Sequence, residues 1–268
     1  IKYYMGYWEN VSGAPLSDYD WLMIHHNAKL SERKRFVEKV VTGTEKVVVD
    51  LGCGPGLWLS LFADHLGDKA EYFGFDSDKK TIELARKLNQ LSLINCSFSH
   101  ENIEVSDLDF PEADIFLVFN ILSYLDNPLT FLNRLKARLK PNGRIIIRQY
   151  DGSTFKFGPL DSKTRYKLEV DLFQSVSSSQ RFRHYSVDDV FTAATACGLT
   201  VDDVQFETFH KTSPFDKSFA MYLLNSLDWT RNFVSRNSQG AIDNWSSQYL
   251  NSTAPSYFYE VDLVMMLS

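Results

Sequence analysis

The chain has 268 residues, of which 44% are hydrophobic and 23% charged, and its formal net charge is −6. This length suffices for one sizeable core with a cap, and apolar residues recur throughout, which excludes wholesale disorder. No apolar run approaches the roughly 18 residues of a membrane-spanning helix, so the sequence predicts no membrane span. The acidic balance disfavours a nucleic-acid partner, which would need a local basic patch.

Aromatic residues make up 14% of the chain, which suits a pocket for an organic ligand as well as ordinary core packing. The three cysteines, Cys53, Cys96 and Cys197, form no CxxC pair. The sequence therefore predicts neither a disulfide framework nor a metal site, and the reducing cytoplasm is the expected compartment. No signal peptide is visible in the sequence.

In chain order, residues 1–30 are aromatic and irregular, and the first helix is predicted over 31–41 from its apolar stripe. Short apolar runs then alternate with helical patterns. Strands are predicted over 46–51, 70–75, 95–98, 113–119 and 144–148, and helices over 57–66, 78–89 and 127–140. Such alternation is typical of βαβ units, in which helices cover both faces of a parallel sheet.

The pattern is less regular after residue 150. Helices are predicted around 168–173 and over 186–196 and 215–236, and strands over 199–209 and 256–266. Two stretches, 152–183 and 211–254, interrupt the alternation. We expect them to form a cap over a site, and a cap suits a small ligand better than a macromolecule.

The most informative segment is the glycine motif at 47–56, VVVDLGCGPG. Asp50 lies near the end of a predicted buried strand, and three glycines follow it at alternate positions. Glycine permits a sharp turn and a close approach of the backbone to a ligand. In an open parallel sheet this turn lies at the carboxyl ends of the strands, where ligands bind.

A dinucleotide is the first alternative ligand for this motif. The GxGxxG fingerprint would need a small residue at position 57, which is Leu57. Asp50 also brings negative charge where a pyrophosphate would lie, whereas that charge is favourable beside an ammonium or sulfonium. Asp76 ends the next predicted strand, where an acidic side chain can bind a ribose diol. The motif therefore predicts a nucleoside with a cationic tail.

The glycine motif, Asp76, the strand 113–120 and the LKPNGR turn at 139–144 together resemble the class I S-adenosylmethionine-dependent methyltransferases. The match covers about residues 40–150, and the last two strands fit more loosely. The resemblance implies an α/β fold. This is a Rossmann-like three-layer sandwich with a mostly parallel seven-stranded sheet, an antiparallel last strand and helical cap inserts.

The resemblance also implies that the chain binds S-adenosyl-L-methionine and releases S-adenosyl-L-homocysteine. Asp50 would order the loop and the methionine end, Gly52 and Gly54 would pass beneath the cofactor, and Asp76 would take the ribose hydroxyls. Asn120, after the fourth strand, would lie near the methyl group. The implied cofactor set is Asp50, Gly52, Cys53, Gly54, Asp76, Ser77, Asn102, Ile103 and Asn120.

One member of this set departs from the family pattern. Asn102 stands where the family usually has Asp before an apolar residue, here Ile103, and would contact the adenine amine. The departure is mild because an amide oxygen accepts the same hydrogen bond.

The acceptor side is less specific. Tyr7 belongs to an aromatic N-terminal segment that either closes over the cofactor or packs a helix onto the sheet, so residues 1–42 are expected to form a lid on a domain at 43–268. Tyr124 either faces the acceptor or packs under a helix. His25 is a candidate for positioning or for a base, and its alternative is an ordinary surface or packed histidine.

Four arginines are further candidates: they hold an anionic group of the acceptor or are solvated surface charges. They are Arg148, Arg165, Arg181 and Arg183.

Three functions stay open at this point. The first is methyl transfer to a nitrogen or oxygen of a small-molecule acceptor in a capped pocket. The second is an RNA or protein methyltransferase, which the acidic balance and the absence of an NPPY-type tetrapeptide at position 120 disfavour. The third is a catalytically silent cofactor-binding subunit, which the intact glycine motif disfavours. A homodimer also stays open.

Overall fold

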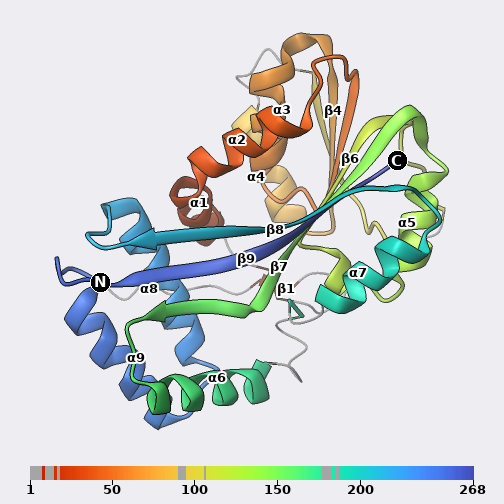
Figure 1. Cartoon of the computed structure of the whole chain (residues 1–268). Coiled ribbons are helices and arrows are strands. Elements are labelled where there is room, and N and C mark those ends of the chain that lie inside the picture. The colour runs from red at the N-terminus through yellow and green to blue at the C-terminus, as the bar shows by residue number, and fades with distance from the viewer. Residues whose placement is uncertain are drawn as a thin grey trace.

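The computed structural model describes residues 19–89, 95–105, 107–176, 183–184 and 187–268, with the backbone of two short paired strands, β1 (Trp8–Glu9) and β2 (Pro15–Leu16). A seven-stranded sheet runs through the molecule, and helices cover it (Figure 1).

The sheet has the strand order β5-β4-β3-β6-β7-β9-β8. Neighbours from β5 to β7 are parallel, whereas β9 is antiparallel to both β7 and β8. The prediction of a mostly parallel seven-stranded sheet with an antiparallel last strand is therefore confirmed. The strands are β3 (Val47–Leu51), β4 (Glu71–Asp76), β5 (Cys96–His100), β6 (Ala113–Phe119), β7 (Leu139–Gly158), β8 (Val201–Thr212) and β9 (Tyr257–Leu267).

Helices cover both faces of the parallel part because successive side chains of a buried strand point to opposite faces. Val48 packs in the core under α2, α3 and α4, and Val49 packs in the core under α5 and α7. These helices are α2 (Leu30–Val40), α3 (Leu57–Leu66), α4 (Lys79–Asn89), α5 (Pro128–Lys136) and α7 (Val187–Ala196), with short 3₁₀ turns η1 (Gly67–Lys69) and η2 (Leu122–Tyr124).

A second core lies where β7, β8 and β9 continue past the parallel strands. Figure 1 shows α6, α8 and α9 gathered along this extension. The strands contribute Phe157, Phe209 and Phe258, and the helices contribute Phe219, Tyr222, Leu223 and Trp245. The helices are α1 (Tyr19–Ala28), α6 (Ser162–Val176), α8 (Lys217–Arg231) and α9 (Arg236–Tyr249), of which α6, α8 and α9 fall in the two stretches expected as inserts.

The expected helix 127–140 is too long. Helix α5 ends at Lys136, and β7 begins at Leu139, opposite Ala113 of β6. The Pro-Asn-Gly segment forms an irregularity inside β7, because Asn142 takes a left-handed φ of 64° and the register then shifts. A Cβ at Gly143 would lie 2.9 Å from the Ala113 carbonyl oxygen, so glycine is needed where the strands meet.

Two further expectations differ from the structure. The helix expected over 215–236 is α8, which ends earlier, at Arg231. Helix α9, which begins after Ser235 takes an extended ψ of 162°, was not expected. The segment expected to be irregular contains helix α1, which has only a weak apolar stripe and whose Ala28 packs into the second core. Contacts with a distant core stabilise this helix, and its own sequence pattern does not show them.

The second core yields a matched stability test on two neighbouring leucines of α8. Leu223 is fully buried, whereas Leu224 is 42% exposed. We expect Leu223→Ala to lower the free energy of unfolding by about 2–5 kcal/mol through cavity formation. Leu224→Ala should change it by less than about 0.5 kcal/mol. Urea unfolding measures both, and equal losses would contradict this packing.

Candidate active site

A cavity of about 430 Å³ lies at the carboxyl ends of the parallel strands, between the glycine motif and the helices of the second core. One wall comes from the loops after β3, β4 and β6, and the opposite wall comes from α1 and α8. All nine residues of the implied cofactor set line it, as do His25 and Tyr124. Tyr7 lies outside the described residues. The topology thus brings distant sequence candidates to one place.

Asp76 fixes the glycine motif at this cavity. Its carboxylate accepts hydrogen bonds from the backbone N–H of Gly54 (2.9 Å) and of Asp78 (2.9 Å). A Cβ added at Gly54 would meet only the Leu22 side chain, at 3.9 Å, so the space beside this backbone is open to a ligand. Burial raises the pKa of Asp76. Asp76 thus fixes the loop, while the space beside Gly54 stays open to a ligand.

Gly52 is needed for a different reason. Its backbone N–H donates to the Phe75 carbonyl oxygen (2.8 Å), and a Cβ there would collide with the Ile121 side chain. Its φ of 70° also favours glycine. The next residue, Cys53, is buried, and burial raises the pKa of its thiol, so it lines the cavity as a neutral group.

Asp50 carries an unsatisfied atom. The side chain is 2% exposed, and its Oδ2 has no hydrogen-bond partner among the residues that the structure describes. Burial, followed by the charge of Asp76, raises the pKa of Asp50 well above its usual range. A buried carboxylate oxygen without a donor is costly, so a donating or cationic ligand group fits this position.

Two amide side chains of the cofactor set, Asn102 and Asn120, have fixed orientations. The Asn102 Oδ1 accepts from the Glu104 backbone N–H (3.0 Å). Asn120 takes a left-handed φ of 58°, and its Oδ1 accepts from the Tyr150 backbone N–H (2.6 Å), so its amide oxygen is tied to β7. This bond was not expected from the sequence.

His25 lies on the opposite wall, between two aromatic rings. Its ring centroid lies 4.2 Å from that of Trp21 and 4.5 Å from that of Tyr222. Its Nε2 is buried and has no partner in the described part of the chain. Burial, with the charges of Lys29 and Arg33, lowers the pKa of His25 well below its usual value, so the ring is neutral at neutral pH.

Tyr124 is a poorer candidate for a base. Its ring packs edge-on against His184, with centroids 5.1 Å apart. Burial raises the pKa of Tyr124 to about 12, so the phenol keeps its proton at neutral pH. It can donate a hydrogen bond or pack against a ligand.

An ion pair that lines the cavity was not predicted from the sequence. Lys29, between α1 and α2, pairs with Glu260 of β9, and the Tyr222 hydroxyl donates to the same carboxylate (2.6 Å). Burial lowers the pKa of Lys29 to about 7. The available signal was spacing: Lys29 follows His25 by four residues, just after α1, and Glu260 lies two residues from Asp262 on a strand.

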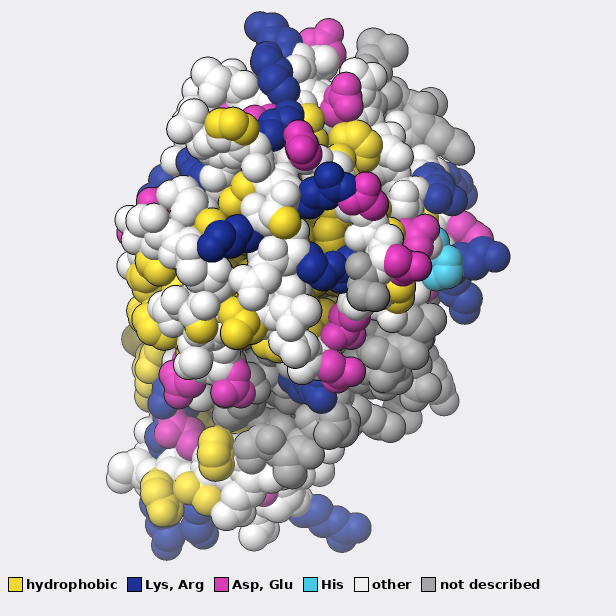
Figure 2. Space-filling model, turned by 90° about the vertical axis from the view of Figure 1, so that its right-hand side faces the viewer, with side chains coloured by type: hydrophobic (Ala, Val, Ile, Leu, Met, Phe, Trp, Pro, Cys, Tyr) yellow, Lys and Arg dark blue, Asp and Glu magenta, His cyan; other side chains and the backbone are white. Residues whose placement is uncertain are grey.

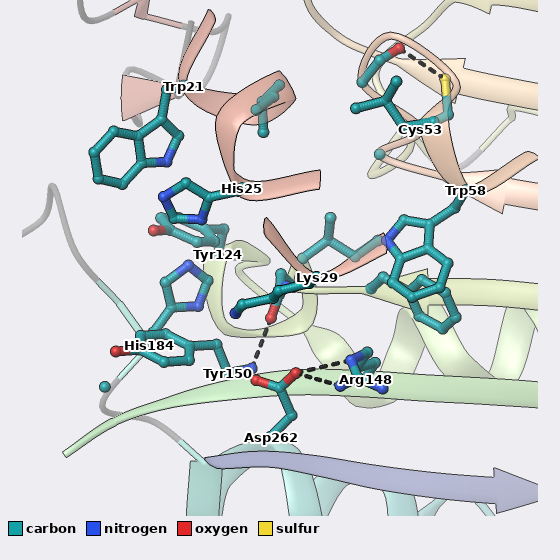
Figure 3. A pocket seen from close by; sticks show the side chains of 18 of the residues that line it. Trp21, His25, Lys29, Cys53, Trp58, Tyr124, Arg148, Tyr150, His184 and Asp262 are labelled. Atoms are coloured by element: carbon teal, nitrogen blue, oxygen red, sulfur yellow. Dashed lines mark hydrogen bonds and ion pairs between the residues drawn. The ribbon is translucent and has the colours of Figure 1, made fainter. Parts of the chain in front are cut away.

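Arg148 lines the cavity and is not the solvated surface charge that one expectation made it. Its guanidinium pairs with Asp262 (2.6 Å) and with Glu207 (2.7 Å). Burial disfavours the charged form of Asp262 and raises its pKa. The positive charges of Arg148 and Lys29 outweigh burial, so the pKa of Asp262 is lowered overall. The Asp262 Oδ1 is buried without a hydrogen-bond partner among the described groups. Figure 3 shows Asp262 held by Arg148 below Lys29.

The other predicted arginines lie elsewhere. Arg165 donates to the Phe157 carbonyl oxygen, Arg183 donates to the Tyr124 carbonyl oxygen (3.0 Å), and Arg181 is outside the described ranges.

A different arginine, Arg33 of α2, lines the cavity. Its Nη1 lies 2.8 Å from Nδ1 of His26, and its guanidinium carbon lies 4.7 Å from the ring centroid of Trp58. Within the described ranges, no carboxylate lies at ion-pair distance from it. Burial and the charge of Arg148 lower its pKa to about 10, so it stays cationic at neutral pH. This cation fits an anionic ligand group.

Charge on the surface is mixed. Figure 2 shows Lys and Arg side chains interspersed with Asp and Glu on the face in view. Of the helices that the structure describes, none combines the length and the apolar character that crossing a bilayer requires.

The chain matches one family model over most of its length and curated relatives over about half of it. A model of a methyltransferase-domain family matches residues 43–226. A ubiquinone biosynthesis O-methyltransferase of Coxiella burnetii is 26% identical over 115 residues, which are 43% of this chain and 48% of that protein. A malonyl-[acyl-carrier protein] O-methyltransferase of Halalkalibacterium halodurans is 29% identical over 136 residues, 50% of this chain and 48% of that protein. The chain thus spans about half the length of the curated relatives it matches.

Solved structures show the same fold. The BH2331 protein of Bacillus halodurans has a TM-score of 0.55 and 15% identity, covering 90% of this chain and 98% of that chain. An S-adenosylmethionine-dependent methyltransferase of Aquifex aeolicus has a TM-score of 0.50 and 19% identity, covering 70% and 92%. With its family match, strand order and glycine motif, the chain belongs to the class I S-adenosylmethionine-dependent methyltransferase family.

Proposed function

We propose that the chain transfers a methyl group from S-adenosylmethionine to an oxygen or nitrogen of a small molecule held in the cavity. The unsatisfied Oδ2 of Asp50, beside the open backbone of Gly54, carries this proposal. The cofactor, when bound, supplies a methyl group activated by a sulfonium. The acceptor atom forms its bond to carbon as the carbon–sulfur bond breaks, and the electron pair of that bond stays on sulfur. Positioning within about 3–3.5 Å supplies most of the acceleration.

The residues present fit this cofactor. Asp50 would bind the ammonium of the methionine end, and the neutral Cys53 would pack beside it. Asp76, already fixed by two backbone donors, would accept from the ribose hydroxyls. Ser77, Asn102 and Ile103 line the same end of the cavity and would surround the adenine.

Arg33 supplies the opposite charge for the methionine end. A zwitterionic amino acid group needs both an anion and a cation, and Asp50 and Arg33 line the same cavity. The aromatic surface of Trp58 orients the guanidinium. We therefore assign the carboxylate of the cofactor to Arg33.

The acceptor side has a candidate for each role. Neutral His25, with its proton on Nδ1, would accept the acceptor's proton at Nε2. Tyr124, protonated at neutral pH, would position the acceptor. Tyr7, in the N-terminal segment 1–42, is proposed to belong to a lid, and the inserts at about 152–183 and 211–254 are proposed to cap the domain at 43–268.

The size and walls of the cavity favour a small acceptor over RNA or a protein. About 430 Å³ lies between two cores, which accommodates a cofactor end with a compact molecule. The unpaired Cys53, Cys96 and Cys197 favour the cytoplasm as the compartment.

Cofactor binding is tested by calorimetric titration with S-adenosylmethionine, S-adenosylhomocysteine and, as a control, NADH. We expect Asp76→Asn to weaken binding of the first two by about 10–100-fold, because a charged acceptor for the ribose is lost. Asp78→Asn removes a nearby carboxylate that caps α4, and it should leave binding nearly unchanged. Tighter binding of NADH, or equal losses in both variants, would contradict the proposed cofactor.

A second titration tests Arg33 directly. Arg33→Met should weaken binding of S-adenosylmethionine by about tenfold or more, because a half-buried cation for its carboxylate is lost. The same variant should bind decarboxylated S-adenosylmethionine as the unaltered protein does. Arg35→Met, which removes an exposed arginine of the same helix, is the control. Equal weakening toward both ligands would show that Arg33 acts on something other than the carboxylate.

A further inference from the structure

We propose that the methyl acceptor is a neutral aromatic compound with two hydrogen-bond donors, one bound by Oδ1 of Asp262 and the other, which is methylated, facing Nε2 of His25. This inference rests on the proposed methyl transfer. Beyond the cofactor end, these are the buried cavity-lining side-chain atoms without a partner in the described part of the chain.

The two atoms come from different elements of the cavity wall, helix α1 and strand β9. His25 and Lys29 are one helical turn apart and share a side of the α1 end, and Glu260 and Asp262 alternate onto one face of β9. The Lys29–Glu260 ion pair joins these two surfaces. The ring of Tyr222 contacts His25 and its hydroxyl binds Glu260, so the spacing of the walls is fixed.

Asp262 lies close to the proposed methyl position. Its Cα partner in β7 is Tyr150, whose backbone N–H is bound by Asn120 at the end of β6. The implied place of Asn120 is beside the methionine portion and the methyl group. A molecule bound to Asp262 therefore lies near the proposed methyl position.

The unpartnered oxygen of Asp262 requires a donor. Arg148 occupies Oδ2, whereas Oδ1 has no donor, and an unsatisfied buried acceptor is costly. The donor should be uncharged, because Lys29 and Arg148 lie beside the same carboxylate and would repel an ammonium. A hydroxyl or a neutral amine meets both conditions.

The walls around this space are flat and aromatic. Trp21 lies against His25, and the rings of Tyr124 and Tyr150 pack edge-on against His184 at 5.1 and 5.8 Å. Figure 3 shows these five rings along one side of the cavity, above Asp262. Such surfaces favour a planar ring over a flexible aliphatic chain.

The test is calorimetric titration of the full chain loaded with S-adenosylhomocysteine. The probes are phenol, the three isomers of dihydroxybenzene and tyramine, which carries an ammonium. We expect at least one dihydroxybenzene to bind about tenfold or more tightly than phenol, and tyramine to bind no better than phenol. Equal binding of phenol and all three diols, or preference for tyramine, would overturn the proposal, as would no binding of any probe.

Two variants test whether the preference for a diol over phenol depends on Asp262. In Asp262→Asn, Arg148 still needs an acceptor, so the amide oxygen takes the Oδ2 position and an N–H replaces Oδ1. The advantage of the diol over phenol should then disappear. Glu207 is the other carboxylate partner of Arg148 and does not line the cavity. The variant Glu207→Gln should therefore still bind the diol more tightly than phenol. An advantage that persists in Asp262→Asn would overturn the role of Asp262; if this variant does not fold, the probe series on the unaltered chain decides.

His25 is tested by transfer of a labelled methyl group to the preferred diol. His25→Asn should lower kcat by about 100-fold with little change in KM, because proton acceptance is lost while Asp262 still binds the diol. An unchanged kcat would overturn the proposed role of His25 as a proton acceptor.

The failure of this inference can be told apart from the failure of the proposed function. If S-adenosylhomocysteine binds but the diols are not preferred, only the proposed acceptor class fails. Absence of binding of both cofactor forms would refute the proposed function itself.

Discussion

The ion pair between Lys29 and Glu260 determines how the two halves of the cavity face each other. It joins the break between α1 and α2 to the last strand, 231 residues away in sequence. Because it is buried beside the second core, removal of either partner would leave an uncompensated charge. His25 and Tyr222 on one side and Asp262 on the other take their positions from this contact. The aromatic wall and the sheet are therefore parts of one cavity.

The cofactor end was predictable because its signals are local in sequence. A buried strand, a turn with glycines and an acidic residue closing the next strand suffice to place Asp50, Gly54 and Asp76 together, since parallel strands end at the same edge. The alternation also indicates a parallel sheet, whereas its seven strands and the antiparallel last strand were expected from the family resemblance. The polarity of this end also follows, because Asp50 disfavours a pyrophosphate and favours a cation.

The proposed acceptor end was not predictable, because its ion pairs join residues far apart. Arg148 and Asp262 are separated by 114 residues, and an isolated arginine shows no sign of its partner. The extension of β7 past residue 148 was also missed, because its alternation is broken by polar residues around Asp151. Helix α1 has little periodicity of its own, so its side chains appeared irregular.

The family match stops at residue 226, inside α8, and begins at residue 43. All nine residues of the proposed cofactor set lie within these limits, whereas His25, Lys29, Glu260 and Asp262 lie outside them. The two ends of the chain fold back to complete one cavity with the shared domain. With the proposed roles, mutations in these flanking segments would diversify acceptor choice over evolution while the inherited residues proposed to bind the nucleoside stay unchanged.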